Sequence, residues 1–396
     1  MRGRGGRRVA ITGYGVLAPC GVGKEAFWQG LLGPGTTGGT STRLADWDPS
    51  PWFDNPKDAR RADRVQQFAM AAAAEALEQA GDTGADPSRI GVIVGTGVGG
   101  LHTLEGQVEV RMEKGERRVS PFLVPMMMAN ACGAAISLRY GFQGPCETIC
   151  TACAASTHAL GYGARQIAWD RCDVVVSGGA ESADTITALA GFANMTALSS
   201  SGTSKPFDTT RDGFVLGEGA AMLVLEEWDR AVERGATIVG EVLGAGSTAD
   251  AYHITAPSPG GSGAVACIEQ ALADAELAAA DIRQINAHGT STPLNDAAEA
   301  EAVAKVFGTP GPPMTSIKGV TGHALGGAGA LEAAAVLLSF EKALIPPTAG
   351  TTEVDRSITA DVVVGEPRPW EPGPTISNSF GFGGHNGTVI IGPGPA

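Results

Sequence analysis

The chain is poor in charged and aromatic residues, and its basic residues are outnumbered by its acidic ones. Charged residues make up 18% and aromatic residues 6% of the 396 positions, and the formal net charge is −14 at neutral pH. A surface of this sign repels nucleic-acid phosphates, so no nucleic-acid partner is expected. The low charge fraction favours a large surface buried against another subunit.

Long apolar runs are also missing, as is the cysteine spacing of a metal or redox site. No stretch of 18 or more apolar residues occurs, so no membrane span is expected, and the start of the chain shows no apolar signal region. The seven cysteines are irregularly spaced. Their single CxxC pair, Cys150 and Cys153, has no partner pair, so zinc is not expected and a thioredoxin-like reading is poor. This cysteine usage favours a reduced, cytoplasmic protein.

Strand-like and helix-like segments alternate along the whole length. Buried strands are predicted at 8–12, 90–95, 173–179, 220–226, 238–245, 282–287 and 389–391, and helices at 63–81, 153–170, 262–279, 296–307 and 326–342. This alternation is typical of mostly parallel sheets covered by helices, either in two domains or in one duplicated α/β core. The glycine loop at 97–100 lacks the spacing of a dinucleotide fingerprint, so no nucleotide cofactor is expected.

Cys153 lies where an apolar strand gives way to a helix of small residues, in Thr-Ala-Cys-Ala-Ala-Ser. A cysteine at the first turn of a helix meets unpaired backbone N–H groups and the positive end of the helix dipole. We therefore expect its pKa to be lowered and its sulfur to accept an acyl group from a thioester. Most of the other cysteines are expected to be small buried hydrophobes.

Two histidines follow far downstream, each in a motif rich in glycine and small polar residues. His288 lies in Asn-Ala-His-Gly-Thr-Ser-Thr, and His323 in Lys-Gly-Val-Thr-Gly-His-Ala-Leu-Gly-Gly-Ala-Gly. Loss of carbon dioxide from a malonyl thioester leaves negative charge on the thioester oxygen. Two neutral imidazoles can each donate an N–H to that enolate, which is an oxyanion-hole role.

Together with the segment Asn-Ser-Phe-Gly-Phe-Gly-Gly near the C-terminus, these motifs resemble the β-ketoacyl-acyl carrier protein synthases over nearly the whole chain. The resemblance implies the thiolase fold, a duplicated five-layered α-β-α-β-α core. Its first half, residues 1–235, would carry the nucleophilic cysteine, and its second half, residues 236–396, the two histidines.

The resemblance also implies roles for single residues. Cys153 would be the nucleophile, and His288 and His323 would bind and decarboxylate the malonyl thioester. Lys318 would organise the site and hold Glu332. The remaining assignments are a gating Phe382, whose backbone N–H joins that of Cys153 in an oxyanion hole, Phe380 beside it, and Val98 and Met128 at the acyl pocket.

The implied activity is a decarboxylative Claisen condensation that elongates a fatty acid or polyketide, with no metal, nucleotide or redox cofactor. Partners would be acyl- and malonyl-loaded carrier proteins, for which a local basic patch is a docking candidate. The chain would act as a homodimer, or as a heterodimer with a chain-length-factor-like subunit. The candidate basic residues are Arg60, Arg61, Arg64, Arg111, Lys114, Arg117 and Arg118.

The sequence departs from the family pattern at several places, and neighbouring families fit it less well. Ala154 and His385 stand where threonine is common, and the modest size of Val98 favours longer acyl chains.

A thiolase needs a second cysteine near the C-terminus, type III synthases use Cys-His-Asn, and chain-length factors lack the nucleophile. Fatty-acid elongation and a type II polyketide or polyene ketosynthase subunit remain equally open.

Overall fold

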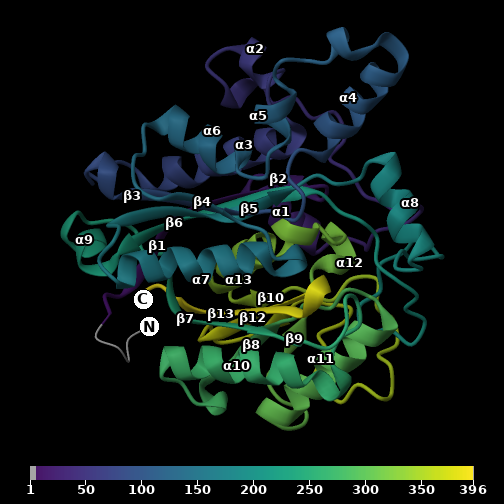
Figure 1. Cartoon of the computed structure of the whole chain (residues 1–396). Coiled ribbons are helices and arrows are strands. Elements are labelled where there is room, and N and C mark those ends of the chain that lie inside the picture. Colours follow the sequence, from purple (N-terminus) through teal and green to yellow (C-terminus); the bar gives the residue numbers. More distant parts are fainter. Residues whose placement is uncertain (1–5, 396) are drawn as a thin grey trace.

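The computed structural model describes residues 6–395 and is built around an eleven-stranded sheet (Figure 1). Its strands are hydrogen-bonded in the order β4-β3-β5-β6-β1-β7-β13-β12-β8-β9, and β2 (Gly21–Val22) pairs with the end of β1. The other strands are β1 (Val9–Ala18), β3 (Ile90–Gly95), β4 (Cys146–Ile149), β5 (Val174–Glu181), β6 (Gly219–Glu227), β7 (Gly240–Ala249), β8 (Gln284–Asn286), β9 (Met314–Thr315), β12 (Thr375–Gly381) and β13 (His385–Pro393).

The sheet is folded into two stacked halves, because β1 pairs with β7 at only two positions, Ala10 with Glu241 and Ile11 with Gly240. Two helices lie between the halves and contact strands of both, while other helices cover the two outer faces (Figure 1). This arrangement confirms the predicted five-layered architecture. The inner helices are α7 (Ala155–Ala168) and α13 (Ala328–Lys342); the outer ones are α3 (Arg64–Ala80) and α6 (Ala131–Tyr140) on one side and α10 (Ser262–Ala275) and α11 (Pro293–Phe307) on the other.

Both halves have the same strand topology, although the sequence shows no crisp repeat. Numbering the five main strands of each half in chain order, the spatial order is third, second, fourth, fifth, first in both. Helices α3 and α7 of the first half therefore correspond to α10 and α13 of the second. The predicted division after residue 235 lies between α9 (Trp228–Glu233) and β7, and it stays a prediction.

Simple sequence features explain the central elements. Every residue of β5 is buried, as a β-branched run covered by helices on both faces should be. Every residue of α13 from Ala328 to Phe340 is buried, so this helix is apolar all round, which is typical of a core helix. Asp63 caps α3 in a capping box with Gln66, where the sequence predicts the helix to begin.

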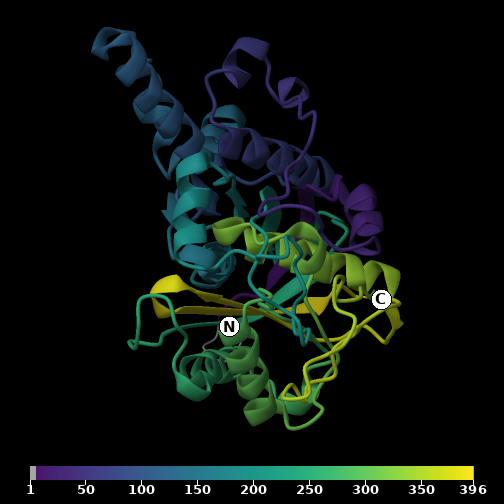
Figure 2. The ribbon, with the colours of Figure 1, turned by 90° about the vertical axis from the view of Figure 1, so that its right-hand side faces the viewer.

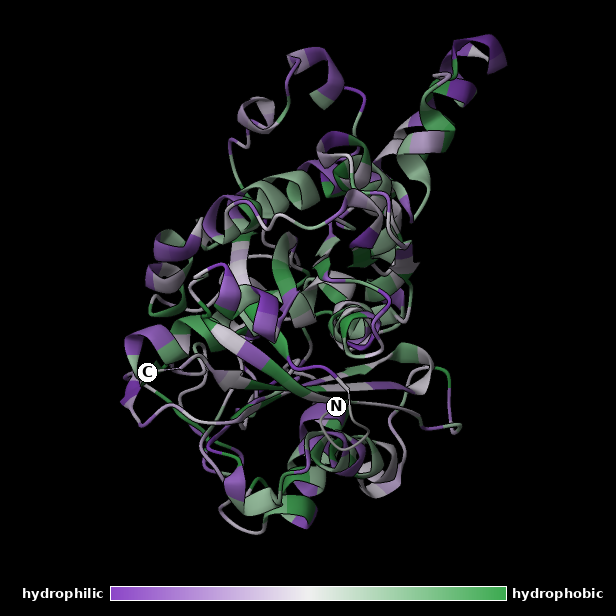
Figure 3. Cartoon of the chain, turned by 90° about the vertical axis from the view of Figure 1, so that its left-hand side faces the viewer, coloured by the Kyte–Doolittle hydropathy of each residue, from purple (hydrophilic) through white to green (hydrophobic). Residues whose placement is uncertain are grey.

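Several elements were not predicted from the sequence. They are α1 (Lys24–Leu31), α4 (Leu101–Lys114), α8 (Ile186–Asn194) and the strand character of β12. Helices α4 and α8 bury no residue in this chain, and apolar side chains such as Leu104, Val108 and Ile186 are exposed on them rather than packed in a core. Helix α4 projects from the body of the molecule, and its far end is hydrophilic (Figures 2 and 3).

The short elements complete the described chain. They are α2 (Pro56–Ala59), α5 (Leu123–Met127), α12 (Lys318–Thr321), β10 (Leu344–Ile345), β11 (Arg368–Pro369) and 3₁₀ turns, of which 152–154, 325–327 and 382–384 matter below. Within residues 6–395 no helix is long and apolar enough to cross a membrane.

Candidate active site

The predicted site residues come from ends of elements that meet between the two halves. Cys153 lies in the 3₁₀ turn directly before α7, and His288 follows β8. His323 lies between α12 and the turn at 325–327, while Phe380 is the penultimate residue of β12 and Phe382 opens the turn after it. The first half therefore supplies the cysteine and the second half both histidines.

Three donor groups converge at this point. The Nε2 atom of His323 lies 3.1 Å from Cys153 Sγ, and the rings of His288 and His323 meet edge to face with centroids 5.3 Å apart. One ligand atom from each of the three residues lies within 4.8 Å of the others, and all three side chains are buried. The structure thus brings together the three residues that the sequence motifs single out.

The expected lowering of the Cys153 pKa is wrong for the free chain. Burial raises the pKa of the Cys153 thiol to about 11, although the backbone N–H of Phe382 and the charge of Lys318 act in the opposite direction. The helix N-terminus can be recognised in the sequence, whereas the loss of water around the sulfur depends on the packing of the folded chain. The thiol is therefore protonated at neutral pH.

This gives a testable pH dependence for the chemical labelling of Cys153. Only the thiolate reacts with iodoacetamide, so the rate should rise about tenfold per pH unit from pH 7 to about pH 10. A free model thiol with a pKa of about 8.5 should level off above pH 9. Peptide mass spectrometry of quenched samples measures the rate, and a plateau for Cys153 at or below pH 9 would contradict the assignment.

Both histidines are held in the neutral form. Burial and the nearby Lys318 charge lower the pKa of His288 and of His323 well below the usual range. The Lys318 ammonium lies 3.3 Å from His288 Nδ1 and can only donate, so Nδ1 accepts and the ring proton of neutral His288 is on Nε2. A neutral imidazole N–H is the donor that an enolate oxygen needs.

Lys318 and Glu332 form a buried ion pair behind the histidines. The Lys318 ammonium contacts the Glu332 carboxylate and also donates to the backbone oxygen of His288 at 2.6 Å. Both side chains are about 1% exposed. Burial raises the pKa of Glu332 above its usual range, and the Lys318 charge partly offsets this. The pair is placed where it can fix the His288 segment and keep both imidazoles uncharged.

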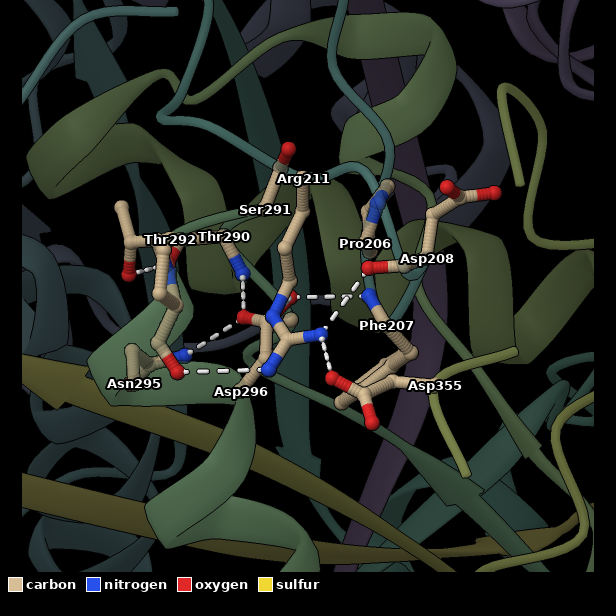
Figure 4. A network of polar contacts seen from close by, with 12 residues as sticks. Pro206, Phe207, Asp208, Arg211, Thr290, Ser291, Thr292, Asn295, Asp296 and Asp355 are labelled. Atoms are coloured by element: carbon tan, nitrogen blue, oxygen red, sulfur yellow. Dashed lines mark hydrogen bonds and ion pairs between the residues drawn. The ribbon is translucent and has the colours of Figure 1, made fainter. Parts of the chain in front are cut away.

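Two buried carboxylates that the sequence analysis did not single out hold the loop after His288. Glu299 accepts hydrogen bonds from the backbone N–H groups of His288 and Gly289, both at 2.8 Å. Asp296 accepts from the N–H of Thr290 at 3.0 Å and from that of Phe207 at 2.8 Å (Figure 4). The sequence feature that could have pointed to these two acids is their position in the first turns of a helix that follows a glycine-containing loop.

The same network ties a second loop to this one. Arg211 bonds Asp355 at 2.7 Å, and its Nε lies 3.9 Å from Asp296 (Figure 4). Burial raises the pKa of Asp296 to about 6 and that of Glu299 to about 7. The loop carrying His288 is thus held by the backbone hydrogen bonds to Glu299 and Asp296, and Arg211 connects Asp296 to the segment of Asp355.

A cavity of about 520 Å³ leads to the three residues. It is lined by apolar side chains and by hydroxyl groups, including Phe214, Thr290, Thr292, Leu325, Phe380 and Phe382, together with Cys153, His288 and His323. Val98 and Met128, predicted at the acyl pocket, do not line this cavity. Each is 46% exposed on the face formed by α4, α5 and α6.

The donor set of Cys153, His288 and His323 is of a kind that binds zinc, with a fourth position open to the cavity. The Lys318 ammonium directly behind His288 places a positive charge next to any cation bound there, which opposes binding of a divalent ion. The prediction that no metal or other cofactor is needed stays a prediction.

Comparison with known proteins decides the family. The N-terminal domain model of β-ketoacyl synthases matches residues 33–231, and the C-terminal domain model matches residues 239–352. The chain belongs to the β-ketoacyl synthase family. It is 40% identical over 409 aligned residues to the 3-oxoacyl-[acyl-carrier-protein] synthase 2 of Vibrio harveyi, covering 97% of this chain and 98% of that protein.

Solved β-ketoacyl synthase structures share the fold of this family member. The ishigamide ketosynthase/chain length factor superposes with a TM-score of 0.91 at 34% identity, covering 98% of this chain and 99% of that one. A β-ketoacyl synthase from Burkholderia phymatum gives a TM-score of 0.90 at 33% identity with the same coverage. The thiolase-like fold expected from the sequence resemblance is confirmed.

Proposed function

We propose that this β-ketoacyl synthase condenses a malonyl group on a carrier protein with an acyl chain held on Cys153. The observation that carries the proposal is the convergence of one buried thiol and two neutral imidazoles at the end of a cavity. It is supported by the relatives named as 3-oxoacyl-[acyl-carrier-protein] synthases.

In the first half-reaction the Cys153 sulfur attacks the carbonyl carbon of an acyl thioester. The bond to the carrier sulfur breaks, the carrier leaves as a thiol with the proton of Cys153, and the acyl group stays on the enzyme. The backbone N–H groups of Cys153 and Phe382 are assigned to the oxyanion formed on the way. The Phe382 N–H already points at Cys153 Sγ, and Phe380 flanks the same segment.

In the second half-reaction a malonyl thioester enters the cavity. Its terminal carbon–carbon bond breaks and releases carbon dioxide, and the electron pair forms an enolate whose oxygen accepts hydrogen bonds from His288 and His323. The enolate carbon attacks the acyl group on Cys153, and the thiolate of Cys153 leaves. The product is a β-ketoacyl chain on the second carrier protein, and no external oxidant or reductant takes part.

Two pathways fit this chemistry. Elongation of fatty acids is supported by the 3-oxoacyl-[acyl-carrier-protein] synthase 2 relatives at 40% identity. Elongation of a polyketide or polyene by a ketosynthase subunit is supported by the ishigamide ketosynthase/chain length factor, which shares the fold at 34% identity. The acyl chains that load Cys153 separate the two.

We also propose a second subunit of the same fold, either a copy of this chain or a chain-length-factor-like partner. Strand β4 is a sheet edge with exposed residues, and Leu138 on the neighbouring helix α6 is 84% exposed. Val98 and Met128 lie exposed on the same side of the molecule, so covering this face would complete an acyl pocket.

We also propose that the carrier protein docks on a basic group of this chain and that the protein is cytoplasmic. Of the candidate basic residues, Arg64 is paired with Glu218 and Arg61 with Asp58, while Arg60 is exposed; we favour the group at the end of α4 because four of the seven candidates gather there. That group is Arg111, Lys114, Arg117 and Arg118, all exposed. All seven cysteines are free, which supports a reducing, cytoplasmic location.

The test is intact-mass spectrometry after incubation with carrier proteins that bear acyl chains of graded length and unsaturation. We expect a mass gain equal to one acyl group, which localises to the peptide of Cys153. Saturated chains as the best donors would favour fatty-acid elongation, and unsaturated chains the polyene alternative. Failure of every donor, both alone and with a chain-length-factor subunit, would refute the proposed function.

A further inference from the structure

A buried carboxylate at the end of β5 joins two turns near Cys153. The side chain of Glu181 accepts a hydrogen bond from the Thr96 hydroxyl at 3.0 Å through Oε1. Its Oε2 atom accepts from the backbone N–H groups of Gly97 at 2.6 Å and Gly326 at 3.0 Å. One carboxylate therefore binds the turn after β3 and the turn before α13.

This carboxylate is fully buried and has no cation beside it. Among the ion pairs formed within residues 6–395 none involves Glu181, and burial raises its pKa to about 7. An acid in such a place is costly and is stabilised here by N–H and O–H donors alone. Those donors are consequently held at fixed positions around it.

The two turns also touch each other directly. A Cβ atom on Gly326 would lie 2.2 Å from the backbone nitrogen of Gly97, so only glycine fits at position 326. A Cβ atom on Gly97 would lie 2.6 Å from Glu181 Oε2, the tip of a side chain. A substitution at 97 would therefore push the carboxylate away while leaving its charge in place.

The two turns lead to different parts of the proposed substrate path: one to the exposed face that a second subunit would cover, the other to the cavity beside Cys153. Gly97 precedes Val98, the residue assigned by resemblance to the mouth of the acyl pocket. Gly326 follows Leu325, which lines the cavity beside Cys153. The Glu181 carboxylate thus fixes the spacing between the turn of Val98 and the turn of Leu325.

We propose that Glu181 is a positioning residue whose contacts to Gly97 and Gly326 select the length of the acyl chain accepted beside Cys153. This inference rests on the proposed condensing function. Loss of the Glu181 contacts should change chain selection without changing decarboxylation, because the backbone of His323 is held by other residues. The backbone N–H of His323 donates to Val215 at 2.8 Å, and its carbonyl oxygen accepts from Gly217 at 3.0 Å.

The test compares Glu181→Gln and Gly97→Ala with the wild-type chain. In Glu181→Gln only one oxygen remains for the three backbone N–H groups, of Gly97, Val98 and Gly326, that donate to the carboxylate, so the clamp is weakened and the charge is removed. Gly97→Ala displaces the side chain but keeps its charge. Acylation of Cys153 by a series of saturated acyl carriers is followed by intact mass, and malonyl-carrier decarboxylation is measured separately.

For both variants we expect the ratio of long-chain to short-chain acylation to change about fivefold or more, as the loss of one buried hydrogen bond implies. Decarboxylation should stay within about twofold of wild type, because His323 keeps its own anchors. Glu226→Gln serves as the matched control. Glu226 is equally buried, pairs with Arg234 and lies at the far end of the neighbouring strand β6, so its loss should lower Tm without changing the ratio.

An unchanged ratio in folded Glu181→Gln and Gly97→Ala would overturn the inference. An equal loss of acylation at every chain length, accompanied by a lower Tm, would assign Glu181 a purely structural role and overturn it too. If the wild-type chain itself accepts no acyl group, the proposed condensing function is wrong, and this inference is wrong as well. If the wild-type chain is acylated and the variants show the same chain-length ratio, only this inference is wrong.

Discussion

Replacing Cys153 by alanine is expected to lower condensation by about a thousandfold or more while malonyl-carrier decarboxylation continues. The variant removes the only atom that can hold the acyl group in the proposed reaction, but it leaves His288, His323 and the cavity in place. Because Cys153 packs in a small apolar cluster, a methyl group should fit there without disturbing the fold. Release of carbon dioxide and formation of the β-ketoacyl product are measured in parallel.

Two further variants make the Cys153→Ala result specific. His288→Ala should lose decarboxylation and still accept an acyl group on Cys153, the opposite pattern. Cys267→Ala removes another fully buried thiol outside the site and should leave both steps intact. Condensation at a wild-type rate in Cys153→Ala would contradict the nucleophile assignment, whatever the two controls give.

Replacing Lys318 by methionine is expected to damage both stability and activity. It leaves the buried Glu332 without its cation, which typically costs about 3–5 kcal/mol of the free energy of unfolding. The ammonium that donates to His288 Nδ1 is also lost, so the proton of that ring is no longer fixed on Nε2. Decarboxylation should fall along with the urea midpoint, and both are measured on the same preparation.

The double variant Lys318→Met/Glu332→Gln separates the two effects. Removing the buried charge as well as its partner should recover much of the lost stability, because no unpaired ion remains. It should not recover decarboxylation, since the donor to His288 is still missing. Recovery of activity together with stability would show that Lys318 acts only as a structural partner of Glu332.

The sequence carried more information about the residues of the site than about their surroundings. Cys153, His288 and His323 stood out because each lies in a segment of small residues, where a side chain is free to reach a cavity. The acids Asp296 and Glu299 did not, because their importance lies in which backbone N–H groups face them. That depends on how the chain folds back, which local spacing does not report.

The secondary structure, like the site, was predicted only in part. Strands such as β5 were predicted because they contain short β-branched runs, here the valines at 174–176. Helices α4 and α8 were not predicted; they bury no residue within this chain, and their apolar side chains, such as Leu104, Val108 and Ile186, lie exposed on the surface. The pKa of Cys153 was misjudged for a related reason. The helix N-terminus is visible in the sequence, whereas the exclusion of water from the sulfur is a property of the packed core.

The inner helices α7 and α13 belong to different halves of the chain, yet each packs against strands of both. During synthesis the first half is complete long before residues 328–342 leave the ribosome. Until then the apolar faces that α13 will cover are open to water, and contacts of high sequence separation must close before the core is sealed. We therefore expect slow, chaperone-dependent folding, and a fragment that ends after β6 should aggregate rather than persist as an independent domain.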